Sequence, residues 1–296
     1  MQRTLGALVA SLGLLAACGS AADTTAGTAT TTTSISVDAP DHIVSMSASA
    51  TEMLFAIGAG DQVVAVDSTS NYPSEAPITD LVAYEPNVEA ISAYEPDLVV
   101  TDGTGDLAAS LDKIGIEVLA LPAAGSLQDA YDQITALGKV TGHEAEAVAL
   151  VAEMQADVAA LVEDLPERDT PLTFFHELDA TLYSVTSATF IGQLYELAGL
   201  ENIADAADPD GKLGGYPQLS AEYLAEANPD LVFLADTKCC AQTLETFAGR
   251  LGFDKLAAVQ GNHVVALDDD VASRWGPRVV DLLREIVAIL RTVPAA

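Results

Sequence analysis

The chain has 296 residues, half of them hydrophobic, which exceeds a typical single domain and predicts two lobes with sizeable cores. Its 12 Lys and Arg residues stand against 44 Asp and Glu residues, a formal net charge of -32. Such a surface repels nucleic acid and anionic lipid headgroups, which argues against both as partners, and it suits a cationic or neutral ligand.

The N-terminal segment has the pattern of an export signal. Arg3 supplies a positive charge, and the apolar run from Leu5 to Ala17 is too short to span a bilayer. The sequence Leu15-Ala16-Ala17-Cys18 resembles the lipobox of bacterial lipoproteins, in which the cysteine receives a lipid. We therefore expect a signal peptide over 1–17, lipidation at Cys18 and a disordered Thr/Ala-rich tether over 18–40. The alternative is an ordinary signal peptide with an accidental cysteine.

Strands and helices alternate over residues 41–140. Short apolar runs predict strands at 42–46, 63–66, 98–101 and 117–121, with helices at 53–57, 107–114 and 126–139 between or after them. Ser49 and Glu52 have the spacing of a capping box that opens the first of these helices. The alternation predicts a parallel α/β lobe.

The longest helical pattern follows. Thr141 and Glu144 form another predicted capping box, apolar residues recur at three and four positions, and the pattern ends at Pro166. Roughly 23 helical residues would span about 34 Å, so we expect 141–166 to be a helix that joins two lobes. The alternative is an ordinary amphipathic packing helix.

The remainder, 167–296, repeats the order of the first half. Asn87-x-Glu89 precedes a Pro-Asp-Leu-Val sequence, and so does Ser220-x-Glu222. Each copy contains a helix cap, a short helix, a proline turn and a buried strand. This duplication predicts two similar α/β lobes that face each other across a cleft.

Enzyme signatures are missing from the sequence. It contains no Gly-x-Ser-x-Gly, His-Glu-x-x-His or Walker motif. Gly103-x-Gly105-x-x-Ala108 has the spacing of a dinucleotide fingerprint, but no acidic residue ends the next strand. We therefore expect neither catalysis nor a cofactor.

Ligands of parallel sheets bind beyond the carboxyl ends of the strands, which selects polar residues in both halves. The densest group is 268–278, where Arg274 suits a charged ligand oxygen and Trp275 suits a flat ligand. Alternatively, the carboxylates of 268–270 neutralise a helix N-terminus and Arg274 is satisfied within the protein.

Cys239 and Cys240 are adjacent, so a disulfide framework is excluded. Three interpretations are open for this pair: small buried residues, a soft-metal site or a redox-labile vicinal disulfide. We predict no metal site. If the chain does bind a metal ion, the candidate ligands are Cys239, Cys240 and His176.

Several motifs resemble the iron-siderophore and vitamin B12 binding proteins of ABC importers, and the resemblance covers about 41 to 292. It is carried by the two Glu and Pro-Asp units and by the segments His42 to Asp61, Asn71-Tyr72-Pro73, Phe190-Ile191-Gly192, Leu197 to Asn202 and Arg274-x-Gly-Pro-Arg278. It implies two parallel-sheet α/β lobes joined by one long interlobe helix. It also implies that Glu89 and Glu222 dock onto arginines of a permease dimer that works with ATPase subunits.

The resemblance also implies a site between the lobes. Tyr216 and Tyr84 match regions where the vitamin B12 protein uses aromatic residues, and Asp270 and Arg274 match residues that face its corrin ligand. Asp102 and Ala83 fall where that protein has tryptophans. The predicted ligand-binding residues are Tyr72, Tyr84, Asp102, His176, Tyr216, Lys238, Asp270, Arg274 and Trp275.

The sequence thus predicts an extracytoplasmic, membrane-anchored solute-binding lipoprotein that binds an iron-siderophore-type metal chelate and delivers it to an ABC permease. The alternative ligand is cobalamin, another corrinoid or haem. Two alternatives from other classes are an extracytoplasmic metalloenzyme and a sensory ligand-binding module.

Overall fold

A computed structural model describes residues 39–294 of the chain. The predicted signal peptide, the lipidation site at Cys18 and nearly all of the predicted tether lie outside these residues. Within them, no helix is both long enough and apolar enough to cross a membrane.

The first half forms a four-stranded parallel sheet in the order β2-β1-β3-β4. The two central strands, β1 and β3, are buried throughout, which is why they read as continuous apolar runs. The strands are β1 Ile43–Met46, β2 Val63–Val66, β3 Leu98–Thr101 and β4 Glu117–Ala120.

The second half forms a second four-stranded parallel sheet in the order β6-β5-β7-β8. This order repeats that of the first sheet strand for strand, as the duplicated sequence unit predicts. The predicted fold class, two parallel α/β lobes, is therefore confirmed. The strands are β5 Thr173–Glu177, β6 Glu201–Asn202, β7 Leu231–Leu234 and β8 Val264–Ala266.

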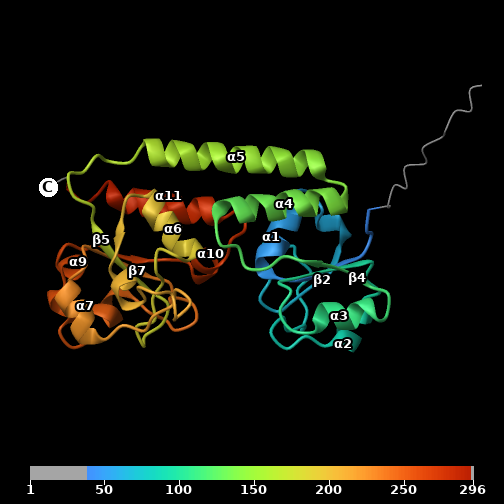
Figure 1. Ribbon diagram of the computed structural model, residues 1–296, viewed down its shortest axis with the longest axis horizontal. Helices are drawn as coiled ribbons and strands as arrows, with labels where there is room; N and C mark the ends of the chain where they lie inside the picture. The colour runs from blue at the N-terminus through green and yellow to red at the C-terminus, as the bar shows by residue number, and fades with distance from the viewer. Residues whose placement is uncertain (1–38, 295–296) are drawn as a thin grey trace, which may run out of the picture. The chain divides into compact units, whose positions relative to one another are not determined.

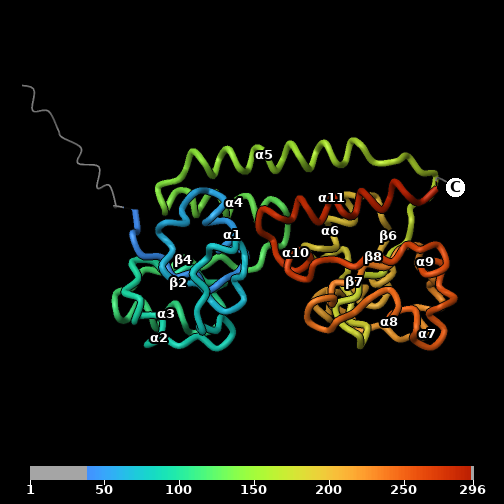
Figure 2. Tube along the Cα trace, turned by 180° about the vertical axis from the view of Figure 1, so that it is seen from behind, coloured from blue at the N-terminus to red at the C-terminus, as the bar shows by residue number. Residues whose placement is uncertain are grey.

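The long helix α5 packs against α4 from the first half and against α11 from the second (Figures 1 and 2). It therefore spans both lobes along one side. The helices are α1 Ala48–Ala56, α2 Val88–Ser92, α3 Leu107–Asp112, α4 Leu127–Thr141, α5 Glu144–Glu163, α6 Phe190–Leu197, α7 Ala221–Ala227, α8 Leu244–Ala248, α9 Ala257–Gln260, α10 Asp269–Ser273 and α11 Val279–Leu290, with short 3₁₀ helices at Gly60–Gln62, Ile203–Ala207 and Phe253–Lys255.

Both sheets are covered on each face by apolar side chains. One core cluster contains buried residues from both halves and from α5, including Ile57, Met154 and Leu283. A second cluster covers the other face of the first sheet, and a third covers the other face of the second sheet. The largest cluster is continuous across the two halves. The lobes are therefore joined by apolar packing in addition to the covalent chain.

Two predicted capping boxes are wrong. Ser47, not Ser49, caps α1, since its side chain accepts a hydrogen bond from the backbone N–H of Ala50. Thr141 is the last residue of α4, which ends at Gly142 in a left-handed conformation with φ 80°. The helix α5 has 20 residues rather than the expected 23 or so, because this glycine interrupts the pattern.

Gly192 at the start of α6 has no room for a side chain. A Cβ atom there would lie 2.0 Å from the carbonyl oxygen of Thr186 and 2.7 Å from the Cα of Ser187. Both atoms belong to the backbone turn that leads into the cap of α6 at Thr189, so neither moves cheaply. The glycine therefore allows the helix to begin directly against this turn.

We predict that Gly192→Ala lowers the free energy of unfolding by about 2–3 kcal/mol, because the turn must shift to relieve the overlap. Chemical denaturation provides the measurement. Gly125→Ala is the matched control, since its Cβ would meet only the side chain of Asp129 at 3.4 Å, and it should change stability by less than about 0.5 kcal/mol. Equal stability of the two variants would contradict the tight approach.

Candidate ligand-binding site

An open cavity of about 330 Å³ lies beyond the carboxyl ends of β1, β2 and β3. The first half supplies its wall from the residues that follow these strands, and the second half supplies α10 and the turn after it. The lining residues are Met46, Ser47, Ala48, Ser49, Thr69, Ala83, Asp102, Asp270, Ser273, Arg274 and Trp275. Both lobes therefore contribute to one cavity at the edge of the sheet where ligands of parallel sheets bind.

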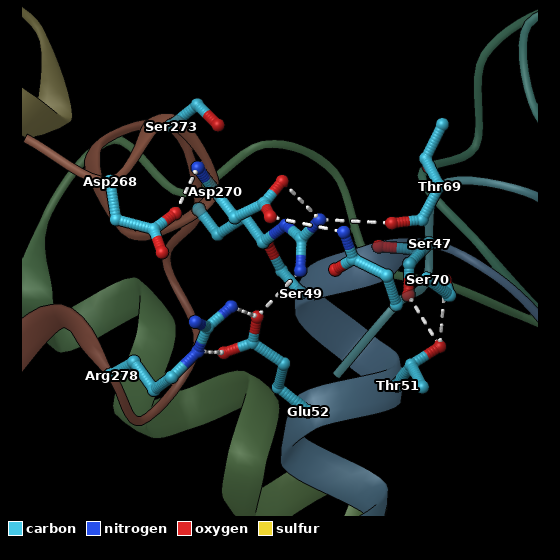
Figure 3. A network of polar contacts seen from close by, with 12 residues as sticks. Ser47, Ser49, Thr51, Glu52, Thr69, Ser70, Asp268, Asp270, Ser273 and Arg278 are labelled. Carbon is cyan, nitrogen blue, oxygen red and sulfur yellow. Dashed lines mark hydrogen bonds and ion pairs between the residues drawn. The ribbon is translucent and has the colours of Figure 1, made fainter. Parts of the chain in front are cut away.

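Glu52 on α1 joins the two halves (Figure 3). Its side chain is almost fully buried, at 2% exposure. It accepts a hydrogen bond from Nη1 of Arg274 at 3.0 Å and one from Nε of Arg278 at 3.0 Å, and Nη2 of Arg278 donates a further one. Both arginines lie more than 220 positions further along the chain. Glu52 is thus an interlobe ion-pair partner and not part of a helix cap.

Arg274 is satisfied within the protein, as one of the two sequence interpretations proposed. Its Nη2 donates to Oδ1 of Asp270 at 2.7 Å and to the backbone oxygen of Thr69 at 2.9 Å, in addition to the Nη1 bond to Glu52. Only 9% of the residue is exposed. The guanidinium therefore holds α10 against the first half, and its exposed edge lines the cavity.

Asp270, in the cavity wall, binds two further side chains. Its Oδ2 accepts hydrogen bonds from Nζ of Lys238 at 2.8 Å and from Nδ2 of Asn71 at 3.0 Å. Burial alone would raise the pKa of Asp270, but these bonds and the charge on Arg274 hold the pKa below its ordinary value. Lys238 also donates to Asp268, the cap of α10, and its two carboxylate partners raise its pKa. The predicted residues Lys238, Asp270 and Arg274 therefore lie in one network.

Trp275 lines the cavity, and hydrogen bonds hold both its backbone and its indole ring. Its backbone N–H donates to Oγ of Ser49 at 3.2 Å, and its Nε1 donates to Oε1 of Gln133 on α4 at 2.9 Å. Both partners belong to the first half. Trp275 therefore follows the second sheet in the chain, but the first lobe holds it in place.

The predicted tyrosines lie outside this cavity. Tyr84 is 79% exposed and Tyr216 is 47% exposed, and neither lines it. Tyr72 lines a separate cavity of about 320 Å³, together with Glu52 and Arg278. The guanidinium carbon of Arg278 lies 4.0 Å from the centre of the Tyr72 ring. Asp102 does line the main cavity.

His176 is buried in the second lobe and does not face the cavity. Its side chain has no exposed surface, and its Nδ1 lies 2.8 Å from the hydroxyl of Tyr195 on α6. Burial lowers its pKa to about 3, so the imidazole is neutral at ordinary pH. The expectation that His176 points into the cleft fails because this strand position faces α6 rather than the sheet edge.

Glu177 and Asp236 form a buried acidic pair at the ends of β5 and β7. Glu177 receives two hydrogen bonds from Arg250, at 2.6 and 2.7 Å, and one from Gln242 at 2.6 Å. Burial raises the pKa of Glu177 to about 7 and raises that of Asp236 as well. Neither oxygen of Asp236 meets a protein donor among residues 39–294. Burial therefore disfavours the charged form of both carboxylates, and Arg250 compensates Glu177 directly.

Cys239 and Cys240 form a vicinal disulfide on the surface. The interpretation of these cysteines as small buried residues is therefore wrong. Their loop is held to α10, because Asp269 accepts hydrogen bonds from the backbone N–H groups of Thr237, Lys238 and Cys239. In the described part of the chain, no group of three or more His, Cys, Asp or Glu side chains has a geometry suited to a metal ion.

We predict that Glu52→Gln lowers the free energy of unfolding by about 3 kcal/mol, because two buried guanidinium groups lose the charge that compensates them. Urea denaturation monitored by circular dichroism provides the measurement. The control is Glu75→Gln, which changes an exposed carboxylate of the neighbouring cavity and should have an effect below about 0.5 kcal/mol. A Glu52 variant as stable as this control would show that the interlobe pairs contribute nothing net.

The buried acidic pair generates a prediction about pH. A carboxyl whose folded-state pKa is raised stabilises the fold below its unfolded pKa, and this contribution is lost as the pH rises through the folded value, about 7 for Glu177. Asp236→Asn removes one of the two acids. Its unfolding free energy should gain about 1–2 kcal/mol relative to the unmodified protein between about pH 5 and pH 8. Asp254→Asn, an exposed site in the same lobe, should show no such gain. Parallel curves for all three proteins would contradict a raised pKa at Asp236.

Comparison with known proteins identifies the family. The family model described as "Periplasmic binding protein" matches residues 43–271. An uncharacterized ABC transporter substrate-binding lipoprotein of Bacillus subtilis, YvrC, is 30% identical over 257 residues, covering 83% of this chain and 79% of its own length. A cobalamin-binding protein of Halobacterium salinarum is 32% identical over 263 residues, covering 84% of this chain and 69% of its own.

Solved structures agree in fold. A possible iron-binding (periplasmic solute-binding) protein from Staphylococcus epidermidis superposes with a TM-score of 0.71 at 26% identity, covering 85% of this chain and 98% of its own. The periplasmic heme-binding protein RhuT from Roseiflexus superposes with a TM-score of 0.73 at 22% identity, covering 85% and 98%, a likeness of fold alone. The family match, the two relatives and the doubled parallel sheets lead to one conclusion: the chain belongs to the periplasmic binding protein family.

Proposed function

We propose that this chain is the extracytoplasmic solute-binding lipoprotein of an ABC importer, which binds a metal chelate between its lobes and delivers it to a permease. The observation that carries the proposal is the cavity at the carboxyl ends of the first sheet, whose wall comes from both lobes. A ligand there contacts both lobes at once, which is how a two-lobed receptor encloses a small molecule.

The membrane anchor in this proposal is the lipid on Cys18. Its support is the lipobox-like ending of the N-terminal apolar segment and the similarity to YvrC, which is named as a lipoprotein. A chain exported and tethered in this way meets its solute outside the cytoplasm. Its cavity can then load before the protein meets the permease.

The ligand class in this proposal is a metal chelate of the iron-siderophore type, with a corrinoid as the second candidate. The first is supported by the solved Staphylococcus protein, named as possibly iron-binding, and the second by the Halobacterium relative, named as cobalamin-binding. Trp275 gives the cavity a flat aromatic surface for either ligand.

Glu89 and Glu222 are the proposed docking residues. Each lies in the first turn of a short capped helix, α2 after Asn87 and α7 after Ser220, and each is exposed. Neither forms an ion pair with another described residue, so both carboxylates remain available to arginines of a partner. Figures 1 and 2 show α2 and α7 at the edge opposite to α5, one in each lobe. A dimeric permease offers two equivalent sites to such a pair.

We predict that the double variant Glu89→Arg and Glu222→Arg abolishes uptake while ligand affinity stays unchanged, because both charges repel the arginines of the permease. Uptake of radiolabelled cyanocobalamin and of radiolabelled ferrioxamine B by cells carrying the importer is measured beside binding to the purified protein. The control is Glu153→Arg with Glu163→Arg, which makes the same charge change on exposed positions of α5. Normal uptake by the docking variant would refute the docking surface.

A further inference from the structure

The cavity has one basic residue in its wall, and that residue is already paired. Arg274 uses one terminal nitrogen for Glu52 at 3.0 Å and the other for Asp270 at 2.7 Å. With 9% of the residue exposed, it has little surface left for a ligand. An anionic ligand would have to take this guanidinium from two carboxylates that already hold it.

The neighbouring cations are also neutralised. Lys238 bonds to Asp268 at 2.6 Å and to Asp270 at 2.8 Å. Arg278 bonds to Glu52 and lines the separate cavity beside Tyr72. The three cations of this network share three carboxylates, Glu52, Asp268 and Asp270, so the network supplies no surplus positive charge.

Asp102 leaves the cavity with surplus negative charge. Its Oδ1 accepts hydrogen bonds from the backbone N–H of Thr104 at 2.9 Å and from its hydroxyl at 2.8 Å. Within residues 39–294 no basic side chain pairs with it. The formal charge of -32 on the whole chain adds to the same field, and a cavity with low-dielectric walls focuses it.

The rest of the wall suits contact without charge. Met46, Ala48 and Ala83 provide apolar surface, and the ring of Trp275 provides an aromatic one. An uncharged ligand gains this contact at no electrostatic cost, and a cation also gains attraction to Asp102. An anion pays either to approach Asp102 or to separate a buried ion pair.

We infer that the cavity selects metal chelates that are neutral or cationic, such as a corrinoid or a ferric hydroxamate, and rejects anionic ones such as a porphyrin dicarboxylate or a ferric tris-catecholate. The inference rests on the proposed function, because it specifies the charge of the chelate that the same cavity binds.

Four probes of different charge test the inference. Cyanocobalamin is a neutral corrinoid, ferrioxamine B is a cationic hydroxamate, and haemin and ferric enterobactin are anionic. Trp275 is the sole tryptophan of the chain and lines the cavity, so quenching of its fluorescence reports occupancy. Thermal shift of the purified full chain provides a second readout. We expect cyanocobalamin or ferrioxamine B to bind at least about a hundredfold more tightly than either anionic probe, a difference of about 2.7 kcal/mol.

A charge variant ties the selectivity to the cavity. Asp102→Asn should weaken ferrioxamine B binding about tenfold relative to cyanocobalamin binding. Asp112→Asn, an exposed acid on α3 outside the cavity, makes the same change in net charge and should alter neither affinity. If ferrioxamine B does not bind, the readout is weak haemin binding, which Asp102→Asn should strengthen about tenfold and the Asp112 control should not.

The outcomes separate this inference from the function beneath it. Tighter binding of haemin or ferric enterobactin than of the other two probes would overturn the charge selection and leave a chelate receptor in place. Equal effects of Asp102→Asn and Asp112→Asn would also overturn it, because the field would then come from the whole surface. Binding of none of the four probes would contradict the proposed function itself.

Discussion

The buried ion pairs of Glu52 with Arg274 and Arg278 are the interaction on which the arrangement of this protein depends. A carboxylate at 2% exposure is costly to bury, and only two guanidinium groups from a distant part of the chain compensate it. Because both arginines follow α10, these bonds fix where the cavity residues of the second half meet the first. The same bonds consume the positive charge that a ligand would otherwise meet. Geometry and selectivity at the cavity thus have one origin.

The two sheets share one strand order, yet their carboxyl ends hold different chemistry. In the first half, polar groups such as Asp102 and Thr69 reach the cavity. In the second half, the residues at equivalent strand ends, Glu177 and Asp236, are buried, and Glu177 is paired with Arg250. The second sheet therefore contributes to the cavity mainly through the segment after β8. The two lobes thus share one strand order, but they contribute different segments to the cavity wall.

The fold could be predicted from the sequence because its signals are local and repeated. Apolar runs, proline turns and the two Glu and Pro-Asp units each specify an element without reference to distant residues. The candidate site could be predicted only from the rule that ligands bind beyond the carboxyl ends of parallel strands. That rule selects Asp102, Asp270, Arg274 and Trp275, which line the cavity. Pairing could not be predicted: Glu52 has the spacing of a cap, and nothing nearby in sequence shows that its partners lie more than 220 residues away. The prediction of His176 as a ligand-binding residue has a similar weakness. The sequence does not show which face of β5 packs against α6, and His176 lies on that face.

The segment that follows β8 limits how far the two halves of this chain can be exchanged. Arg274, Trp275 and Arg278 are continuous in sequence with the second sheet, but their bonding partners Glu52, Ser49 and Gln133 belong to the first half. A chimaera that exchanged one half at α5 would leave the buried carboxylate of Glu52 without Arg274 and Arg278. These contacts therefore couple the two halves, and neither lobe can be replaced alone without leaving buried charges unpaired.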